Sequence, residues 1–74
     1  MQLKSLTKTC DTQPSVWIGE TSDGFMFYAK YERGHLYFVA GGTNLSFGLD
    51  YGSGYDSSMD TDEMLRLTGI EVVA

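Results

Sequence analysis

The pair Arg33-Gly34 lies between two β-prone runs rich in apolar and aromatic residues, and this arrangement constrains the fold more than any other feature of the chain. The runs cover residues 25–32 and 35–40. A two-residue loop with glycine in its second position is typical of a tight β-hairpin. In the register that such a loop sets, one face of both strands is nearly all apolar, so the turn and the pattern predict the same hairpin independently.

The hairpin assigns each of its residues to one face of a sheet. The buried face is expected to carry Phe25, Phe27, Ala29, Tyr31, Leu36, Phe38 and Ala40. The second face is expected to carry Met26, Tyr28, Lys30, Glu32, His35, Tyr37 and Val39. Two interpretations of the second face stay open. Either a helix covers it and makes a second core layer, or its aromatic side chains form an exposed patch that marks an interface.

Shorter β-prone segments flank the hairpin. Residues 16–18 form a short apolar run, and residues 1–15 carry no clear pattern. A turn at 41–44 precedes the alternating segment 45–51, which predicts a third long strand. The buried face of that strand would consist of Leu45, Phe47, Leu49 and Tyr51. Residues 70–73 are predicted to form a last short strand.

One short helix is predicted after a glycine-rich connection. Asp60 is a good N-cap, and Glu63 three residues later completes a capping-box-like pair. Met59 and Met64 occupy the two positions of a hydrophobic staple. Gly69 is the residue expected just after the last helical turn.

Together these elements predict a single compact α+β domain over residues 1–74. We expect an antiparallel β-meander of about four strands, one short helix packed over one face, and a C-terminal strand added at an edge. Seventy-four residues leave no room for a second core. The apolar content of 42% is too high for a disordered chain.

Several classes of function find no support in the sequence. Cys10 is the only cysteine, so an intramolecular disulfide is excluded, and a lone thiol fits a reducing compartment. Cys10 and His35 are too few for a metal site, and His35 is expected to form a polar cross-strand pair with Glu32. Because no nucleophile–base pair or phosphate-loop motif is present, we expect neither enzymatic activity nor a cofactor. The sequence shows no apolar run of about 18 residues and no signal peptide, so the expected location is the cytoplasm.

The negative charge lies in the second half of the chain. Residues 1–33 hold four acids and four bases, whereas residues 34–74 hold six acids and one base, which accounts for the net charge of −5. Direct nucleic-acid binding is disfavoured, because it needs a basic face. The candidate partner-binding residues are Asp50, Asp56, Asp60, Asp62 and Glu63, with Tyr51 and Tyr55 beside them. These carboxylates either imitate a phosphate backbone and occupy a basic groove on a protein partner, or only keep the chain soluble.

In its size, acidity, single cysteine and richness in tyrosine and glycine, the chain resembles the small phage-encoded inhibitors of bacterial defence, above all the anti-CRISPR proteins. The resemblance concerns size, charge and composition over the whole chain and rests on no shared motif, so no residue role is carried over. It implies a compact α+β domain that binds and blocks a nuclease complex, in some members by mimicking DNA.

Two functional hypotheses follow from these observations. The first is a non-enzymatic, phage-encoded inhibitor in the host cytoplasm, whose acidic surface blocks the DNA-binding site of a CRISPR-Cas type effector. Its partner would be a protein with a basic surface, and the chain itself would be a monomer or a homodimer. The second is a small structural or accessory interaction domain, homodimeric through a sheet face or edge.

Overall fold

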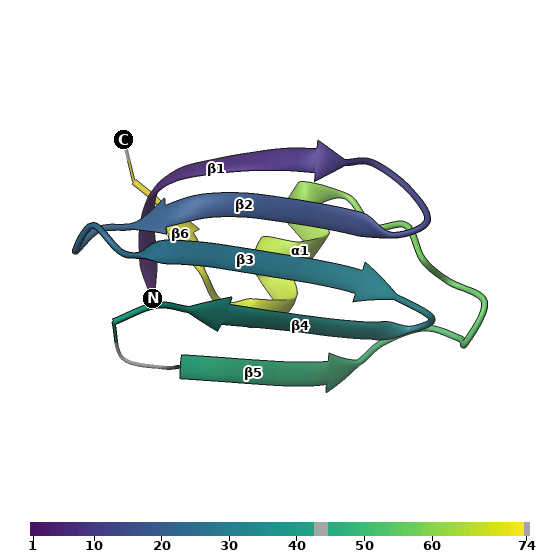
Figure 1. Cartoon of the computed structure of the whole chain (residues 1–74). Coiled ribbons are helices and arrows are strands. Elements are labelled where there is room, and N and C mark those ends of the chain that lie inside the picture. Colours follow the sequence, from purple (N-terminus) through teal and green to yellow (C-terminus); the bar gives the residue numbers. More distant parts are fainter. Residues whose placement is uncertain (43–44, 74) are drawn as a thin grey trace.

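The computed structural model describes residues 1–42 and 45–73. For Leu45 it describes the backbone only. Its strands are β1 (Gln2–Cys10), β2 (Ser15–Thr21), β3 (Met26–Glu32), β4 (His35–Ala40), β5 (Leu45–Asp50) and β6 (Glu71–Val72). Its helix is α1 (Thr61–Thr68). The strands form one sheet in the order β5-β4-β3-β2-β1-β6, in which β1 to β5 are an antiparallel meander and β6 runs parallel to β1 at the edge (Figure 1).

The expected combination of a meander, one short helix and a C-terminal edge strand is present, but the expected number of about four meander strands is wrong. The sheet contains six strands within the described residues, five of them in the meander. The missed strand is β1, which the sequence pattern did not indicate. Its pairing with β2 shifts register between Leu3 and Ser5 and again between Lys8 and Cys10. Each such irregularity breaks the alternation of apolar and polar residues on which strand prediction depends.

The hairpin at Arg33-Gly34 is confirmed. Both residues have positive φ, 54° and 74°, as a tight turn between twisted strands requires. The pairing of β3 with β4 follows the predicted register, with Glu32 opposite His35. The expected burial of Phe25 is wrong, because this residue precedes β3 and its side chain is 47% exposed. Of the turn expected at 41–44, residues 43–44 lie outside the described part of the chain.

The helix has the predicted boundaries but not the predicted capping box. Asp60 is the N-cap, with extended backbone geometry, yet its side chain makes no capping hydrogen bond. Glu63 bonds instead to Arg66, so the reciprocal pair expected with Asp60 is wrong. Gly69 ends the helix with a φ of 74°, and its N–H donates to the Leu65 carbonyl at 2.9 Å. Gly69 therefore ends the helix after eight residues.

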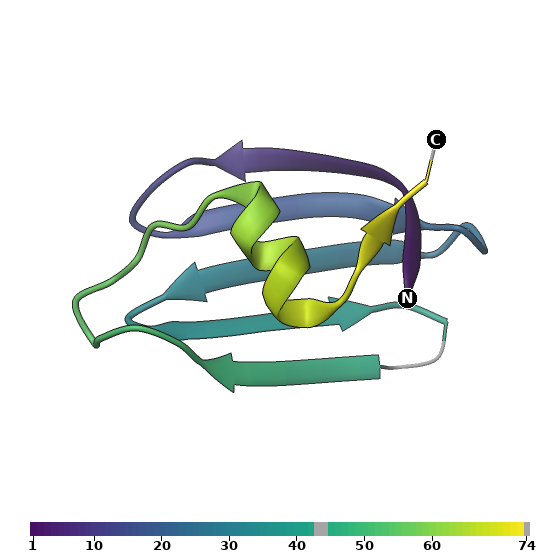
Figure 2. The same cartoon turned by 180° about the vertical axis from the view of Figure 1, so that it is seen from behind.

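The core lies between α1 and one face of the sheet. Figure 2 shows the helix crossing the sheet over β2, β3 and β4 and leaving β5 uncovered. Trp17 is fully buried there, and its indole N–H donates to Thr61 Oγ1 at 2.9 Å, which ties β2 to the first turn of the helix. The core residues are Leu3, Trp17, Phe27, Ala29, Tyr31, Leu36, Phe38, Met59, Met64 and Ile70.

The position of the helix corrects one expectation about β5. Phe47 was expected on a buried face, but its side chain is 40% exposed, and that of Tyr51 is 37% exposed. Phe47 stacks on Phe38 with ring centroids 5.3 Å apart, so one side of its ring is packed. Its other side is open because an eight-residue helix does not reach the outermost strand.

The connection from β5 to α1 is fastened to the turn between β1 and β2. Ser15 is fully buried, and its N–H donates to the Ser57 carbonyl at 3.0 Å. Its hydroxyl donates to the Asp11 carbonyl at 2.6 Å and accepts the Met59 N–H at 2.9 Å. One buried hydroxyl therefore joins two loops that are far apart in sequence.

Candidate interaction surfaces

The face of the sheet opposite α1 is open, which decides between the two interpretations of the second hairpin face. Tyr28 pairs with Ile18 on β2 and with Val39 on β4, so these side chains form a row across three strands. Ile18 is 49% exposed and Met26 is 58% exposed. We call the following residues the open-face strip: Val16, Ile18, Met26, Tyr28, Tyr37 and Val39. The idea of a second core layer is wrong: Ile18 and Met26 are exposed, and the other four side chains of the strip are only half-buried.

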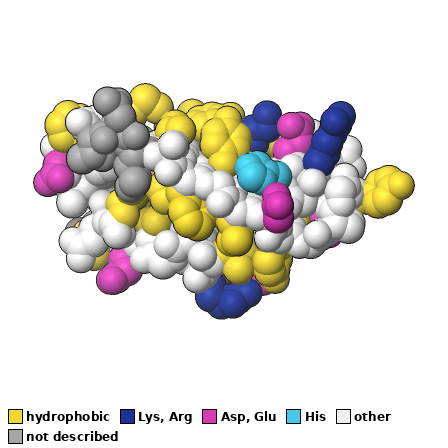
Figure 3. Space-filling model, turned by 90° about the horizontal axis from the view of Figure 1, so that it is seen from below, with side chains coloured by type: hydrophobic (Ala, Val, Ile, Leu, Met, Phe, Trp, Pro, Cys, Tyr) yellow, Lys and Arg dark blue, Asp and Glu magenta, His cyan; other side chains and the backbone are white. Residues whose placement is uncertain are grey.

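Paired charges lie at both ends of the open-face strip. The pairs are Lys4 with Glu20 at 3.6 Å, Lys30 with Glu32 at 3.3 Å, and His35 with Asp50 at 2.8 Å. The hydrogen bond and the negative charge of Glu32 raise the pKa of Lys30 above its ordinary value. Figure 3 shows hydrophobic side chains along the open face, uppermost in that view, with cationic and anionic side chains next to one another at one end.

The predicted acidic residues do not form one continuous patch. Asp50 lies on the open face and accepts a bond from His35, away from the others. Asp56 accepts the Ser53 N–H at 2.7 Å, which holds the loop after β5. His35 therefore pairs with Asp50 and not with Glu32, its cross-strand neighbour, because Glu32 pairs with Lys30.

The other acidic candidates gather around the start of α1. Asp56, Asp60 and Glu63 line one hollow of about 240 Å³ together with Tyr51, whose hydroxyl donates to Glu63 at 3.2 Å. Asp60 and Asp62 are exposed. With Glu63 and Arg66 they line a second hollow that adjoins the first. Tyr55 is 97% exposed in the preceding loop. The structure thus brings Asp56, Asp60, Asp62, Glu63 and Tyr51 into one region and leaves Asp50 outside it.

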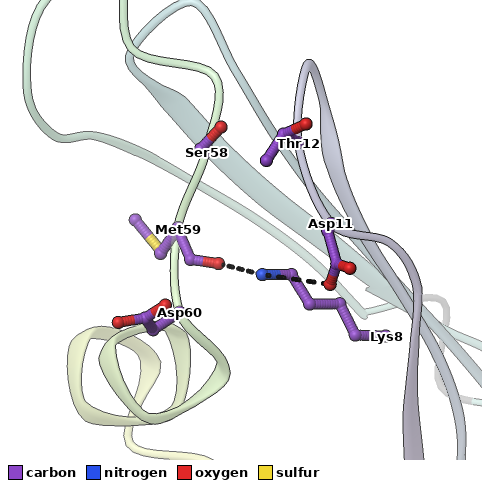
Figure 4. Close-up of a pocket in the computed structure, with 6 residues that line it drawn as sticks. All are labelled: Lys8, Asp11, Thr12, Ser58, Met59 and Asp60. Carbon is purple, nitrogen blue, oxygen red and sulfur yellow. Dashed lines mark hydrogen bonds and ion pairs between the residues drawn. The ribbon is translucent and has the colours of Figure 1, made fainter.

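Lys8 is a residue of this region that sequence reasoning missed. Its Nζ donates to the Met59 carbonyl at 2.6 Å and lies 3.9 Å from Asp11 Oδ1 (Figure 4). The same Nζ lies 5.4 Å from the centroid of the Trp17 ring, within reach of a cation–π interaction. The surrounding hollow, about 360 Å³, is lined by Lys8, Asp11, Thr12, Ser58, Met59 and Asp60. No local sequence signal could identify this contact, because Lys8 and Met59 are 51 positions apart.

Among residues 1–42 and 45–73, no group of three His, Cys, Asp or Glu side chains is placed to hold a metal ion. Cys10 is exposed, and its thiol contacts the Thr12 carbonyl at 3.5 Å. The one helix in the described ranges is too short and too polar to cross a bilayer.

Comparisons with protein families, with curated proteins and with solved structures find no match for this chain.

Proposed function

We propose that this chain is a non-enzymatic binding domain that docks a protein partner on the open-face strip. One observation carries the proposal: α1 covers a single face of the sheet and leaves an apolar row on the other face exposed. Apolar surface that stays in water is unfavourable by about 25 cal/mol per Å², so covering it with a partner is a source of binding energy. Exposed apolar patches of this kind mark interaction sites.

The composition of the strip indicates the chemistry of the partner. Its centre is apolar and aromatic, with Tyr28 and Tyr37 rings 6.2 Å apart, and its ends carry charges that are already paired within the chain. Protein interfaces have this anatomy, with an apolar centre that excludes charge and a polar rim. A matching partner surface is therefore apolar with a mixed polar border, and it need not be basic.

A bait comparison tests this proposal. Tagged wild type, Ile18→Lys and Tyr55→Lys are used to capture proteins from a lysate of the producing cells, and the captured proteins are quantified by mass spectrometry. Ile18 and Tyr55 are both exposed, so neither change should unfold the domain. A genuine partner is retained by wild type and by Tyr55→Lys, and its affinity for Ile18→Lys falls by about 30-fold or more, as expected for a central interface residue. Equal capture by all three baits would refute the proposal.

A second candidate is the acidic inhibitor that the resemblance to anti-CRISPR proteins implies. What favours it is the gathering of Asp56, Asp60, Asp62 and Glu63 near the start of α1. We propose that this region, without Asp50, is the one that would bind a basic, nucleic-acid-binding surface of a defence effector. Because exposed charges act through steering, their effect should be on the association rate and should fade with salt.

The two candidates are separated by removing charge without adding it. Asp60→Asn with Asp62→Asn removes two charges from the acidic region, and Asp23→Asn with Glu71→Gln removes two exposed charges elsewhere. If the acidic region binds the partner, Asp60→Asn with Asp62→Asn should slow association with a captured partner several-fold at low salt, and the other double variant should not. If both double variants behave alike, the acidity has a general role in solubility, and the open-face proposal is unaffected.

A further inference from the structure

The outer edge of β5 presents a row of backbone groups that nothing in the described chain covers. In the hairpin turn, Glu32 and His35 form the closing hydrogen-bonded pair, so the backbone groups of Leu36 point away from β3 and toward β5. The Tyr51 N–H donates to the Gly34 carbonyl at 2.8 Å, which fixes the same alternation from the other strand. Leu49 and Phe47 therefore bond to β4, and the N–H and C=O groups of Ser46, Gly48 and Asp50 point outward.

We infer that this edge self-associates: β5 of a second copy of the chain pairs with it in antiparallel orientation, centred on Gly48. In this register Gly48 faces Gly48, and Ser46 of each copy faces Asp50 of the other. All the outward-pointing groups of these residues then find partners. A centre at Phe47 satisfies fewer of them within the described residues, and a centre at Asp50 places two carboxylates directly opposite each other.

The side chains fit a second copy of the same strand. On the helix side of the sheet, the half-exposed Phe47 meets Leu49 of the other copy, so each apolar side chain gains an apolar neighbour. Asp50 is the only charged residue of β5, and in this register the two copies hold it about 13 Å apart along the strands, beyond the screening length at physiological salt. The strand thus complements itself without charge repulsion.

Apart from Asp50, the β5 edge also lacks the devices that normally prevent edge pairing. It contains no Lys and no Pro, and its pairing with β4 shows no bulge. The opposite edge of the sheet is different: the two-residue β6 covers only the start of β1, but the rest of β1 carries Lys4 and Lys8 and two shifts of register. Figure 3 looks onto the β5 edge and shows hydrophobic side chains on both sides of it. A second β5 is therefore the occupant that the edge suits best.

The interface is small, and this sets the strength of the dimer. A strand of this length is about 20 Å long and roughly 10 Å thick with its side chains, so each copy buries a few hundred Å² at most, well below the roughly 800 Å² of a standard interface. The dimer should therefore be weak and dependent on concentration. Its twofold axis is perpendicular to the sheet, so both open-face strips lie on the same side. This inference goes beyond the proposed function and does not depend on it.

The test uses the whole chain, labelled with ¹⁵N, in a dilution series from about 1 mM to about 20 μM, followed by amide shifts and by sedimentation. The amide signals of Ser46, Gly48 and Asp50 should move with concentration, and those of Phe47 and Leu49 should move less. Ser46→Pro removes one outward N–H at an edge position that tolerates proline, and should weaken dimerisation about tenfold or more. Ser46→Ala keeps the N–H and should dimerise like wild type.

Three results would overturn the inference. The first is a chain that stays monomeric up to about 1 mM, the top of the dilution series. The second is a concentration-dependent shift confined to Ile18, Tyr28 and Val39, which would place self-association on the open-face strip. The third is a folded Ser46→Pro variant that dimerises as well as Ser46→Ala. The wild-type shifts decide the matter even if the proline variant does not fold.

Discussion

Tyr31 is the residue whose ionisation is most clearly linked to folding. Its side chain is 2% exposed, and its hydroxyl donates to the Tyr51 carbonyl at 2.5 Å. Burial raises the pKa of the Tyr31 hydroxyl above its ordinary value of about 10, and the negative charge of Asp56 adds to this effect. The folded chain therefore holds this proton more tightly than the unfolded chain does. The resulting stability is complete below about pH 10 and is lost as the pH rises through the folded pKa.

We predict that the free energy of unfolding, measured with urea, falls more steeply above about pH 10 in wild type than in Tyr31→Phe. Near neutral pH the variant should be less stable by about 0.5–1.5 kcal/mol, because the Tyr51 carbonyl loses its donor. The difference between the two proteins should then shrink as the pH rises. Parallel pH profiles would show that Tyr31 does not contribute to the alkaline loss of stability.

At the scale of elements, the β3–β4 hairpin supplies the centre of the core. Phe38 is 5% exposed and packs between Phe27 and Phe47, with ring centroids 5.5 and 5.3 Å away. Phe38→Ala should therefore destabilise the domain by about 3–5 kcal/mol through the cavity that it leaves. Tyr37→Ala on the other face of the same strand should cost clearly less. Equal shifts of the urea midpoint for both variants would mean that the two faces are not buried differently.

The hairpin and the helix were predictable because local chemistry specifies them. Arg33-Gly34 fixes the turn and the alternation fixes the faces, while Met59, Asp60 and Gly69 mark the helix ends. The other parts of the fold depend on contacts between residues that are far apart in the sequence. Lys8 and Ser15 are polar residues on the covered side of the sheet, and backbone groups of the segment before α1 satisfy them. A pattern of apolar residues carries no information about hydrogen-bond partners that are far away in the sequence. The strand β1, which contains Lys8, was therefore not predicted.

The candidate site shows the same limit. Asp60 and Asp62 are neighbours in sequence and in space, so the acidic region at the start of α1 could be predicted in part. The placement of Asp50 could not, because the register of β5 directs its side chain to the opposite face of the sheet, next to His35. The apolar pattern of the hairpin identified its buried face, but it left open whether the second face was also covered, because that depended on where α1 packs.

At the scale of the whole molecule, one thin core holds two layers together. The sheet supplies most of the core residues, α1 supplies Met64, and Met59 and Ile70 flank the helix. The helix alone is too short to be stable in water. An asymmetric two-layer domain of this kind has a covered face and an open face by necessity, because a single short helix cannot cover both. The open-face strip and the β5 edge are therefore consequences of the same architecture.

The same architecture predicts that sheet and helix unfold together. Trp17 is the only tryptophan, it is fully buried in β2, and it is bonded to Thr61 of the helix, so its fluorescence reports on the contact between the layers. Urea transitions followed by Trp17 fluorescence and by far-ultraviolet circular dichroism should coincide, as two-state unfolding requires.

Thr61→Val sharpens this prediction, because it removes the acceptor of the indole N–H while nearly preserving side-chain shape. Both transitions should shift to lower urea by the same amount, equivalent to about 1–3 kcal/mol for a buried donor left without a partner. If the helix were an independent appendage, circular dichroism would lose its helical signal at a lower urea concentration than fluorescence does, and Thr61→Val would widen that gap. Coincident and equally shifted curves are the result expected when the eight-residue helix and the sheet are one cooperative unit.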